Sequence, residues 1–234
     1  MIAIVDYGSG NIQAIKNIYK KLKIECVFAS EPGDLEGVTK IILPGVGAFD
    51  EAMTQLSRSG MREILDMMVL EQNIPVLGVC VGMQIMAKSS DEGKLEGLSW
   101  FDAEVKLFDE SKLKHKPKLP HMGWNEIVPT LNHSIFDSID IEKGFYFLHS
   151  YFFSCNNKND VLAEANYGGN FHCAVNKNNI RLSDIEIGGT NIALNASFES
   201  VSKSPPSSKL LKGEFKNSLA DSFSLFIIGI TTFL

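Results

Sequence analysis

The chain has 234 residues, a net charge of −6, 44% hydrophobic residues and 21% charged residues. This composition is typical of one globular α/β domain, or of one domain with an extension. The acidic balance, without a basic stripe, argues against a nucleic-acid partner. Since no apolar run reaches the roughly 20 residues that span a bilayer, we expect no membrane partner either.

The cysteines and the N-terminus indicate the compartment. Four cysteines are scattered along the chain without a CxxC pair, which favours neither a zinc site nor a disulfide framework. The first six residues have the pattern of a strand, and no basic region precedes them as in a signal peptide. We therefore expect a cytoplasmic protein with reduced thiols and no bound metal.

The first hundred residues alternate between apolar runs and helical spacing. Strands are predicted over 2–6, 24–29, 38–43 and 74–79, and helices over 11–22, 49–70 (interrupted near 59–60) and 82–88. This alternation predicts a parallel sheet with right-handed crossovers. The turn 7–11 lacks the full dinucleotide fingerprint, so we expect no cofactor. A tight turn capped by Asn11 and a substrate or partner role both remain possible for it.

After about residue 100 the pattern changes to strands separated by turns. They are predicted over 103–107, 124–128, 144–153, 161–166 and 171–175, as antiparallel additions to the sheet. The amino-acid composition changes again near residue 181. Residues 202–209 have a linker-like composition, and residues 223–234 are strongly apolar. This end is either a final packed strand or helix, or a tail foreign to the original design.

Residues 74–84 are typical of a nucleophile elbow. The apolar run ends at Cys80, glycines stand two residues before and after it, and an expected helix follows at once. The glycines remove Cβ atoms that would collide across the turn, and a helix N-terminus favours thiolate over thiol. We interpret Cys80 as a nucleophile; the alternative is a buried, unreactive cysteine.

Two other features lie at the same edge of the predicted sheet. Gln84 falls one helical turn after Cys80, so its amide would face the same pocket unless it is an ordinary solvated residue. The turn 44–47 is rich in glycine, and its exposed N–H groups would suit an oxyanion hole. Both segments follow the carboxyl ends of strands, where open α/β sheets bind ligands.

Two aromatic-rich segments hold further candidates. In residues 120–125, Trp124 and Asn125 are plausible interface anchors, although a loop with a packed tryptophan would have the same pattern. His149 ends an aromatic strand and is a possible base for Cys80. A histidine in such a strand is more often a satisfied core residue, and the strand alternation decides which face it takes.

Five motifs stand in the order found in class I glutamine amidotransferases: residues 6–11, 43–49, 78–84, 120–125 and 149–151. More narrowly, the chain resembles the glutaminase subunits of imidazole glycerol phosphate synthases, over residues 1–180. The resemblance implies a three-layer, flavodoxin-like α/β fold with a central, mostly parallel sheet. We therefore expect an amidotransferase domain over 1–180 and a divergent tail over 181–234.

The resemblance also implies a mechanism and a partner. Cys80 would attack the side-chain amide of glutamine and release ammonia, and water would then release glutamate. The ammonia would pass to a (β/α)₈-barrel synthase subunit in a heterodimer. The implied oxyanion donors are Val81 and either Val46 or Gly47; the implied glutamine-binding residues are Gly47, Gln84, Ser150 and Tyr151; the implied interface residues are His121, Trp124 and Asn125.

One family motif is missing. The family completes its catalytic triad with His-Pro-Glu, which should follow residue 180, but residues 181–188 read Arg-Leu-Ser-Asp-Ile-Glu-Ile-Gly. His172 is the last histidine and lies in the preceding strand, so we do not assign it the catalytic role. Because the leaving ammonia needs a proton that the thiolate cannot supply, we expect weak or no glutaminase turnover.

Several functions remain open at this point. An amidotransferase subunit could serve histidine biosynthesis or a nucleotide sugar in a surface-polysaccharide pathway. A catalytically dead partner-binding module is the second possibility, as a true pseudoenzyme or through a frameshift or rearrangement of the tail. A cysteine hydrolase with His149 as base is the third, and it would leave the glutamine-site motifs without a purpose.

Overall fold

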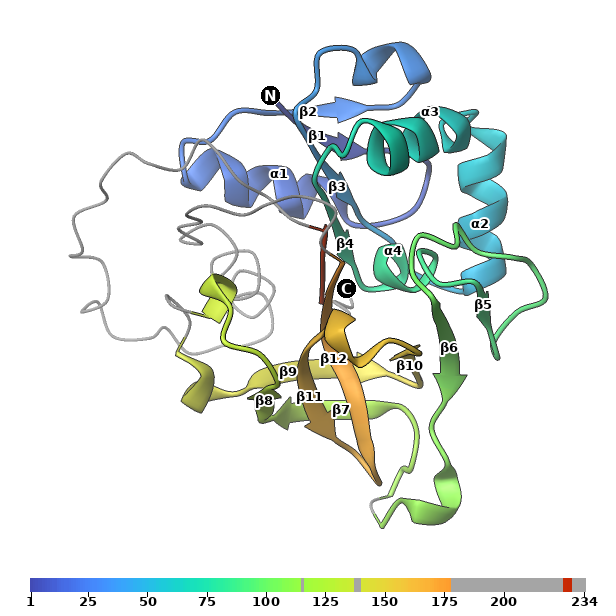
Figure 1. Ribbon diagram of the computed structural model, residues 1–234, viewed down its shortest axis with the longest axis vertical. Coiled ribbons are helices and arrows are strands. Elements are labelled where there is room, and N and C mark those ends of the chain that lie inside the picture. Colours follow the sequence, from blue (N-terminus) through green and yellow to red (C-terminus); the bar gives the residue numbers. More distant parts are fainter. Residues whose placement is uncertain (115, 137–139, 178–224, 229–234) are drawn as a thin grey trace.

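The computed structural model describes residues 1–114, 116–136, 140–177 and 225–228, the last four by their backbone alone (Figure 1). Parallel strands form its centre in the order β2-β1-β3-β4. Their bounds are β1 Ile2–Val5, β2 Cys26–Ala29, β3 Lys40–Leu43 and β4 Val76–Val79. The predicted parallel sheet is therefore confirmed.

Helices cover both faces of this sheet because alternate side chains of β1 and β3 point to opposite sides. Ile2, Ile4 and Ile42 pack beside Tyr19 of α1 (Ile12–Lys21). The other face belongs to the largest core cluster, with α2 (Phe49–Arg58), α3 (Arg62–Asp66), the π-turn η2 (Met67–Glu71) and α4 (Val81–Gln84). Figure 1 shows α1 on one side of β1, β3 and β4, and α2, α3 and α4 on the other. The three-layer architecture is confirmed.

The sheet continues beyond β4 in the order β13-β12-β10-β6-β5, with antiparallel pairs from β13 to β6 and a parallel pair between β6 and β5. β11 pairs with β12, and β8 pairs with β11, both antiparallel. A separate ribbon pairs β7 with β9. The bounds are β5 Ser89–Ser90, β6 Ala103–Leu107, β7 His121–Asn125, β8 Ile127–Pro129, β9 Phe145–His149, β10 Tyr151–Cys155, β11 Val161–Asn166, β12 Asn170–Lys177 and β13 Leu225–Ile228. Short 3-10 turns complete the chain: η1 Pro32–Leu35, η3 Glu110–Lys112, η4 Ser134–Phe136, η5 Ile141–Lys143 and η6 Lys158–Asp160.

Two predicted strands are each divided in the structure. The prediction of one strand over 144–153 is wrong, because β9 pairs with β7 whereas β10 pairs with β6 and β12. Similarly, β7 ends before Glu126, and β8 then pairs with β11. Strand propensity runs through both breaks, and only the tertiary partners divide the segments.

The helix after Cys80 is shorter than predicted. It ends at Gln84 rather than near residue 88. The carbonyl groups of residues 85–87 accept hydrogen bonds of 2.7 to 3.1 Å from backbone N–H groups of residues 98–101. These carbonyls therefore have partners without a longer helix.

The tail contributes one described strand. β13 lies between β4 and β12, parallel to the first and antiparallel to the second. The expectation of a packed strand or helix in 223–234 is thus met by a strand over Leu225–Ile228. The linker-like segment 202–209 and the rest of the tail before β13 lie outside the described residues. A domain boundary near residue 180 stays a prediction.

Candidate active site

Cys80 occupies a strained turn between β4 and α4. Its φ is +59° and its ψ is −120°, in a region that residues other than glycine rarely adopt. Its carbonyl accepts hydrogen bonds from the N–H groups of Met83 and Gln84, at 2.9 and 3.1 Å. Its side chain is buried. Strain of this kind concentrates at functional sites, and it supports the predicted elbow.

The glycines around the elbow lie in close contact with neighbouring atoms. A Cβ on Gly78 would lie 2.8 Å from the methyl carbon of Met86. A Cβ on Gly82 would collide with the carbonyl oxygen of Leu43, and one on Gly45 with the backbone of Gly82. The close approach of Gly45 to Gly82 brings the turn 44–47 against the elbow, as the sequence predicted for an oxyanion site.

A narrow pocket lies beside Cys80 and brings several predicted residues together. Its lining residues are Cys80, Met83, Gln84, His149, Tyr151, Phe152, Phe153, Phe171, His172 and Cys173. The side-chain amide nitrogen Nε2 of Gln84 lies 3.4 Å from the carbonyl oxygen of Tyr151, to which it donates. Ser150 separates β9 from β10 next to this pocket, while Val46 and Gly47 lie on the turn 44–47.

The turn after β1 holds the turn 44–47 in place. The Ser9 hydroxyl accepts a hydrogen bond from the Val46 N–H and donates one to the Val46 carbonyl, each at 3.0 Å. The Tyr7 hydroxyl donates to the Pro44 carbonyl at 2.7 Å, and burial raises the pKa of this phenol. In this conformation the Val46 N–H therefore donates its hydrogen bond to Ser9. The sequence left the role of the turn after β1 open. The signal for its contact with the turn 44–47 was Ser9, a serine between two glycines.

His149 shares the pocket with Cys80, but both of its ring nitrogens are engaged elsewhere. Nδ1 lies 2.8 Å from the carbonyl oxygen of Tyr151, and Nε2 lies 3.0 Å from Nδ1 of His121. Burial lowers the pKa of His149 to about 4, against a weaker opposing effect of the Tyr151 hydrogen bond. These bonds count against His149 as the base of Cys80, and so against the hydrolase alternative.

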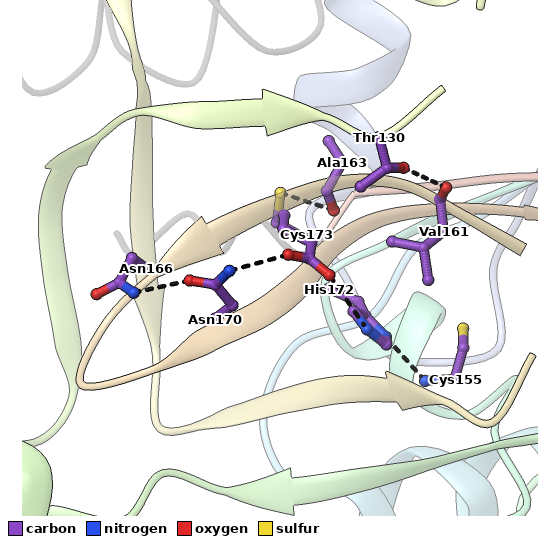
Figure 2. A network of polar contacts seen from close by, with 9 residues as sticks. Thr130, Cys155, Val161, Ala163, Asn166, Asn170, His172 and Cys173 are labelled. Carbon is purple, nitrogen blue, oxygen red and sulfur yellow. Dashed lines mark hydrogen bonds and ion pairs between the residues drawn. The ribbon is translucent and has the colours of Figure 1, made fainter. Parts of the chain in front are cut away.

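His172 is held by a polar network across β11, β12 and β10 (Figure 2). Its Nδ1 accepts a hydrogen bond of 3.0 Å from the Cys155 N–H, and its Nε2 lies 3.8 Å from a carboxylate oxygen of Glu164. Asn170 donates to the other oxygen of that carboxylate at 3.1 Å. Burial lowers the pKa of His172, and the charge of Glu164 partly offsets this. These contacts agree with the sequence prediction that His172 is not the family's catalytic histidine.

The residues predicted at a partner interface divide between surface and interior. Trp124 on β7 is 59% exposed, and its neighbour on the same face, Met122, is 58% exposed. His121 is buried beneath that face. Asn125 is half-buried and contacts the buried histidine. Its Nδ2 donates to the Asn166 carbonyl at 2.8 Å and lies 3.3 Å from Nε2 of His121.

Glu92 is a site candidate that the sequence prediction missed. Its carboxylate accepts a hydrogen bond of 2.8 Å from the Phe49 N–H at the start of α2. Burial raises the pKa of Tyr151, and the charges of Glu92 and Asp91 raise it further. The Glu92 carboxylate therefore acts on Tyr151, the tyrosine predicted to bind glutamine. The only signal was an acidic pair following the helix after Cys80.

Neither a metal centre nor a membrane span is found in the described part of the chain. No group of three or more His, Cys, Asp and Glu side chains among these residues could hold a metal ion. No helix in the same residues is long and apolar enough to cross a membrane.

Comparison with known proteins identifies the family. A family model described as glutamine amidotransferase class-I matches residues 3–183. The chain is 52% identical over 180 residues to imidazole glycerol phosphate synthase subunit HisH of Bdellovibrio bacteriovorus, covering 77% of this chain and 88% of that protein. The subunit of the same name from Leptospira interrogans is 46% identical, with the same coverage.

Solved structures support the fold alone, because their sequence identities are low. A crystal structure of a glutamine amidotransferase gives a TM-score of 0.52 at 17% identity, covering 73% of this chain and 89% of that one. The structure of PurLQS from Thermotoga maritima gives a TM-score of 0.53 at 15% identity, covering 74% and 80%. From the family model and the sequence relatives, the chain belongs to the class I glutamine amidotransferases.

Proposed function

We propose that this chain is the glutaminase subunit of an imidazole glycerol phosphate synthase, acting in cytoplasmic histidine biosynthesis as a heterodimer with a (β/α)₈-barrel subunit. The observation that carries the proposal is the strained Cys80 at the end of β4, in a pocket that also holds Gln84 and Tyr151. The names of the two relatives support the choice of pathway over a surface-polysaccharide pathway.

The described residues supply the nucleophile and the binding contacts for this chemistry, but not the histidine that would protonate the leaving ammonia. The Cys80 thiolate attacks the carbon of the glutamine side-chain amide, the C–N bond breaks, and ammonia leaves once its nitrogen has taken a proton. Water then cleaves the thioester, which releases glutamate and returns the thiol. The Val81 N–H at the start of α4 suits the developing oxyanion. The side-chain amide of Gln84 is suited to form hydrogen bonds with the polar groups of glutamine. The Glu92 carboxylate is suited to pair with the α-ammonium group of glutamine.

Turnover is expected to be weak because the His-Pro-Glu motif is missing from the sequence. Both histidines that line the described pocket are held by other groups. In a comparable nucleophile–base unit, loss of the histidine reduces kcat by about 10⁶-fold. We expect glutamate release, with the barrel partner present, far below that of the Bdellovibrio bacteriovorus subunit. Equal turnover in a side-by-side assay would overturn this expectation.

Covalent labelling tests the glutamine site independently of turnover. A chloroketone analogue of glutamine should label Cys80 saturably and faster than it labels the other cysteines, and free glutamine should slow the labelling. The variant Cys80→Ala should take up no label at this rate. Mass spectrometry of the intact chain gives the rate and the modified peptide. Labelling that does not saturate, or that ignores glutamine, would contradict the proposal.

The missing motif also supports a second candidate, a non-catalytic module that binds the barrel subunit. Both candidates predict a stable complex with the barrel, so complex formation does not separate them. Saturable labelling of Cys80 by the glutamine analogue favours the amidotransferase. Labelling no faster than that of a free thiol, together with complex formation, favours the binding module.

A further inference from the structure

A line of hydrogen bonds crosses the antiparallel part of the molecule and ends in the pocket. It begins at the side chain of Asn125 on β7, passes through the rings of His121 and His149, and reaches the Tyr151 carbonyl. The successive distances are 3.3, 3.0 and 2.8 Å. Gln84, one turn after Cys80, donates to the same carbonyl oxygen at 3.4 Å. The line therefore joins β7 to the residues beside the nucleophile.

The hydrogen-bond partners at each end of the line determine which atom donates and which atom accepts at every step. The Asn125 amide is oriented because its oxygen accepts from the Glu126 N–H at 2.9 Å and its nitrogen donates to the Asn166 carbonyl. Its second N–H must then point at His121, whose Nε2 can only accept. A neutral His121 carries its proton on Nδ1 and donates it to Nε2 of His149.

His149 completes the same pattern. Because its Nε2 accepts, its proton lies on Nδ1, where the Tyr151 carbonyl is the acceptor. Every donor in the line thus meets an acceptor only when both rings are neutral. The low pKa of His149 agrees with a ring that stays neutral.

Aromatic rings enclose the two histidines and fix their planes. The ring of His121 stacks between Tyr167 and Phe147, with centroids at 4.1 and 5.0 Å. The ring of His149 meets the edge of Phe108 at 5.2 Å. Hydrogen bonds in such a low-dielectric environment are strong, and a buried polar group without its partner costs free energy. His121 cannot turn without losing its stacking and its hydrogen bonds, and His149 cannot turn without losing its ring contacts and its hydrogen bonds.

We propose that His121 and His149 are positioning residues that hold the Tyr151 carbonyl, and through it the Gln84 amide, in the arrangement that accepts glutamine. They also connect this arrangement to β7, whose outer face presents Trp124. The proposal rests on the proposed function, because it concerns the affinity of the same glutamine site.

Two substitutions interrupt the line in different ways. His121→Phe keeps a ring between Tyr167 and Phe147 but removes the donor to His149. Asn125→Asp removes the N–H groups that face His121 and the Asn166 carbonyl and puts a carboxylate oxygen in their place. This acceptor draws the proton of a neutral His121 to Nε2, so the ring faces His149 with a lone pair. Phe145→Leu is the matched control, because Phe145 is buried on β9 opposite Asn125 but takes no part in the line.

The readouts separate positioning from general damage. The chloroketone analogue of glutamine gives a saturation constant and a maximal labelling rate at Cys80, while iodoacetamide reports the thiol without a glutamine group. Both line variants should raise the saturation constant about fivefold, as expected for one lost buried hydrogen bond, and leave the iodoacetamide rate within twofold. Phe145→Leu should leave both unchanged.

The outcomes are distinct. An unchanged saturation constant in the line variants overturns the proposal, as does an equal loss of labelling by both reagents. His121→Asn retains a donor near the position of Nδ1 and should recover at least half of the lost affinity; if His121→Phe does not fold, Asn125→Asp decides alone. If the wild-type chain itself shows no saturation with the glutamine analogue, the proposed function fails, and this inference fails with it.

Discussion

At the scale of single residues, Cys80 owes its conformation to its neighbours rather than to its own preference. A φ of +59° costs a residue with a side chain about 1 to 3 kcal/mol. The fold holds it there because Gly78 and Gly82 allow the helix and β3 to approach where any Cβ would collide. Sequence spacing alone sufficed to predict this turn, because paired glycines around a cysteine at the end of an apolar run indicate a close backbone approach on both sides.

Substitution of Gly82 tests this close approach. Gly82→Ala places a methyl group against the Leu43 carbonyl oxygen, and backbone on both sides leaves it little room to move. We expect a loss of about 3 kcal/mol of unfolding free energy, measured by urea denaturation. Gly33→Ala is the control, since nothing lies within 4 Å of its added Cβ and it should change stability by less than about 1 kcal/mol. Equal effects of the two variants would contradict the close approach of β3 to the elbow.

The buried His149 predicts a dependence of stability on pH. Its pKa is about 4 in the folded chain and about 6.5 when unfolded, so between these values the unfolded state binds more protons. Its contribution is therefore complete above pH 6.5 and is lost as pH falls to 4, by about 3 kcal/mol.

The variant His149→Asn isolates this contribution, because asparagine keeps a donor for the Tyr151 carbonyl but does not titrate. Between pH 8 and pH 4 the wild-type chain should lose about 3 kcal/mol more unfolding free energy than the variant. Groups that do not contact His149, including His172, titrate in both chains and cancel in the difference. Parallel curves for the two proteins would mean that His149 accepts a proton at an ordinary pKa in the folded state.

At the scale of elements, the sequence predicted the parallel half better than the antiparallel half. The strands β1, β3 and β4 have apolar runs bounded by glycine-rich turns, so local pattern and tertiary position agree. The break at Ser150 has no such local mark, because aromatic residues with strand propensity stand on both sides. Only the separate partners of β9 and β10 divide the segment. The hydrogen-bonded line through His121 depends on the same pairing and was equally hidden.

The ribbon β7–β9 carries a prediction about partner binding. Trp124 is 59% exposed, and exposed aromatic side chains of this kind are common anchors of interfaces. Trp124→Ala should weaken binding of the proposed (β/α)₈-barrel partner by about 2 kcal/mol, roughly thirtyfold, with an unchanged melting temperature. Titration calorimetry measures the affinity. Val128→Ala is the control, because Val128 is 66% exposed on the neighbouring β8 and should not affect binding. Equal affinities of the two variants would place the interface elsewhere.

At the scale of the whole molecule, β13 decides whether the sheet is continuous. It pairs with β4 on one side and β12 on the other, and thereby joins the parallel half, which carries Cys80, to the antiparallel half, which carries Tyr151. Without it, two strand edges in the middle of the molecule would lose their partners, and such edges promote aggregation. Residues far beyond the family match therefore bear on the integrity of the site.

Ile227 provides a test through the backbone alone. It lies opposite Gly78 of β4 and Val175 of β12, so proline at this position removes an N–H from the middle of a sheet. Ile227→Pro should lower the unfolding free energy by about 3 kcal/mol and increase aggregation, as followed by thermal denaturation and size-exclusion chromatography. Ile227→Val keeps the N–H and the strand propensity, and should behave like the wild-type chain to within about 1 kcal/mol. If the proline variant is as stable as the valine variant, β13 does not join the two halves, and another segment must cover the edges of β4 and β12.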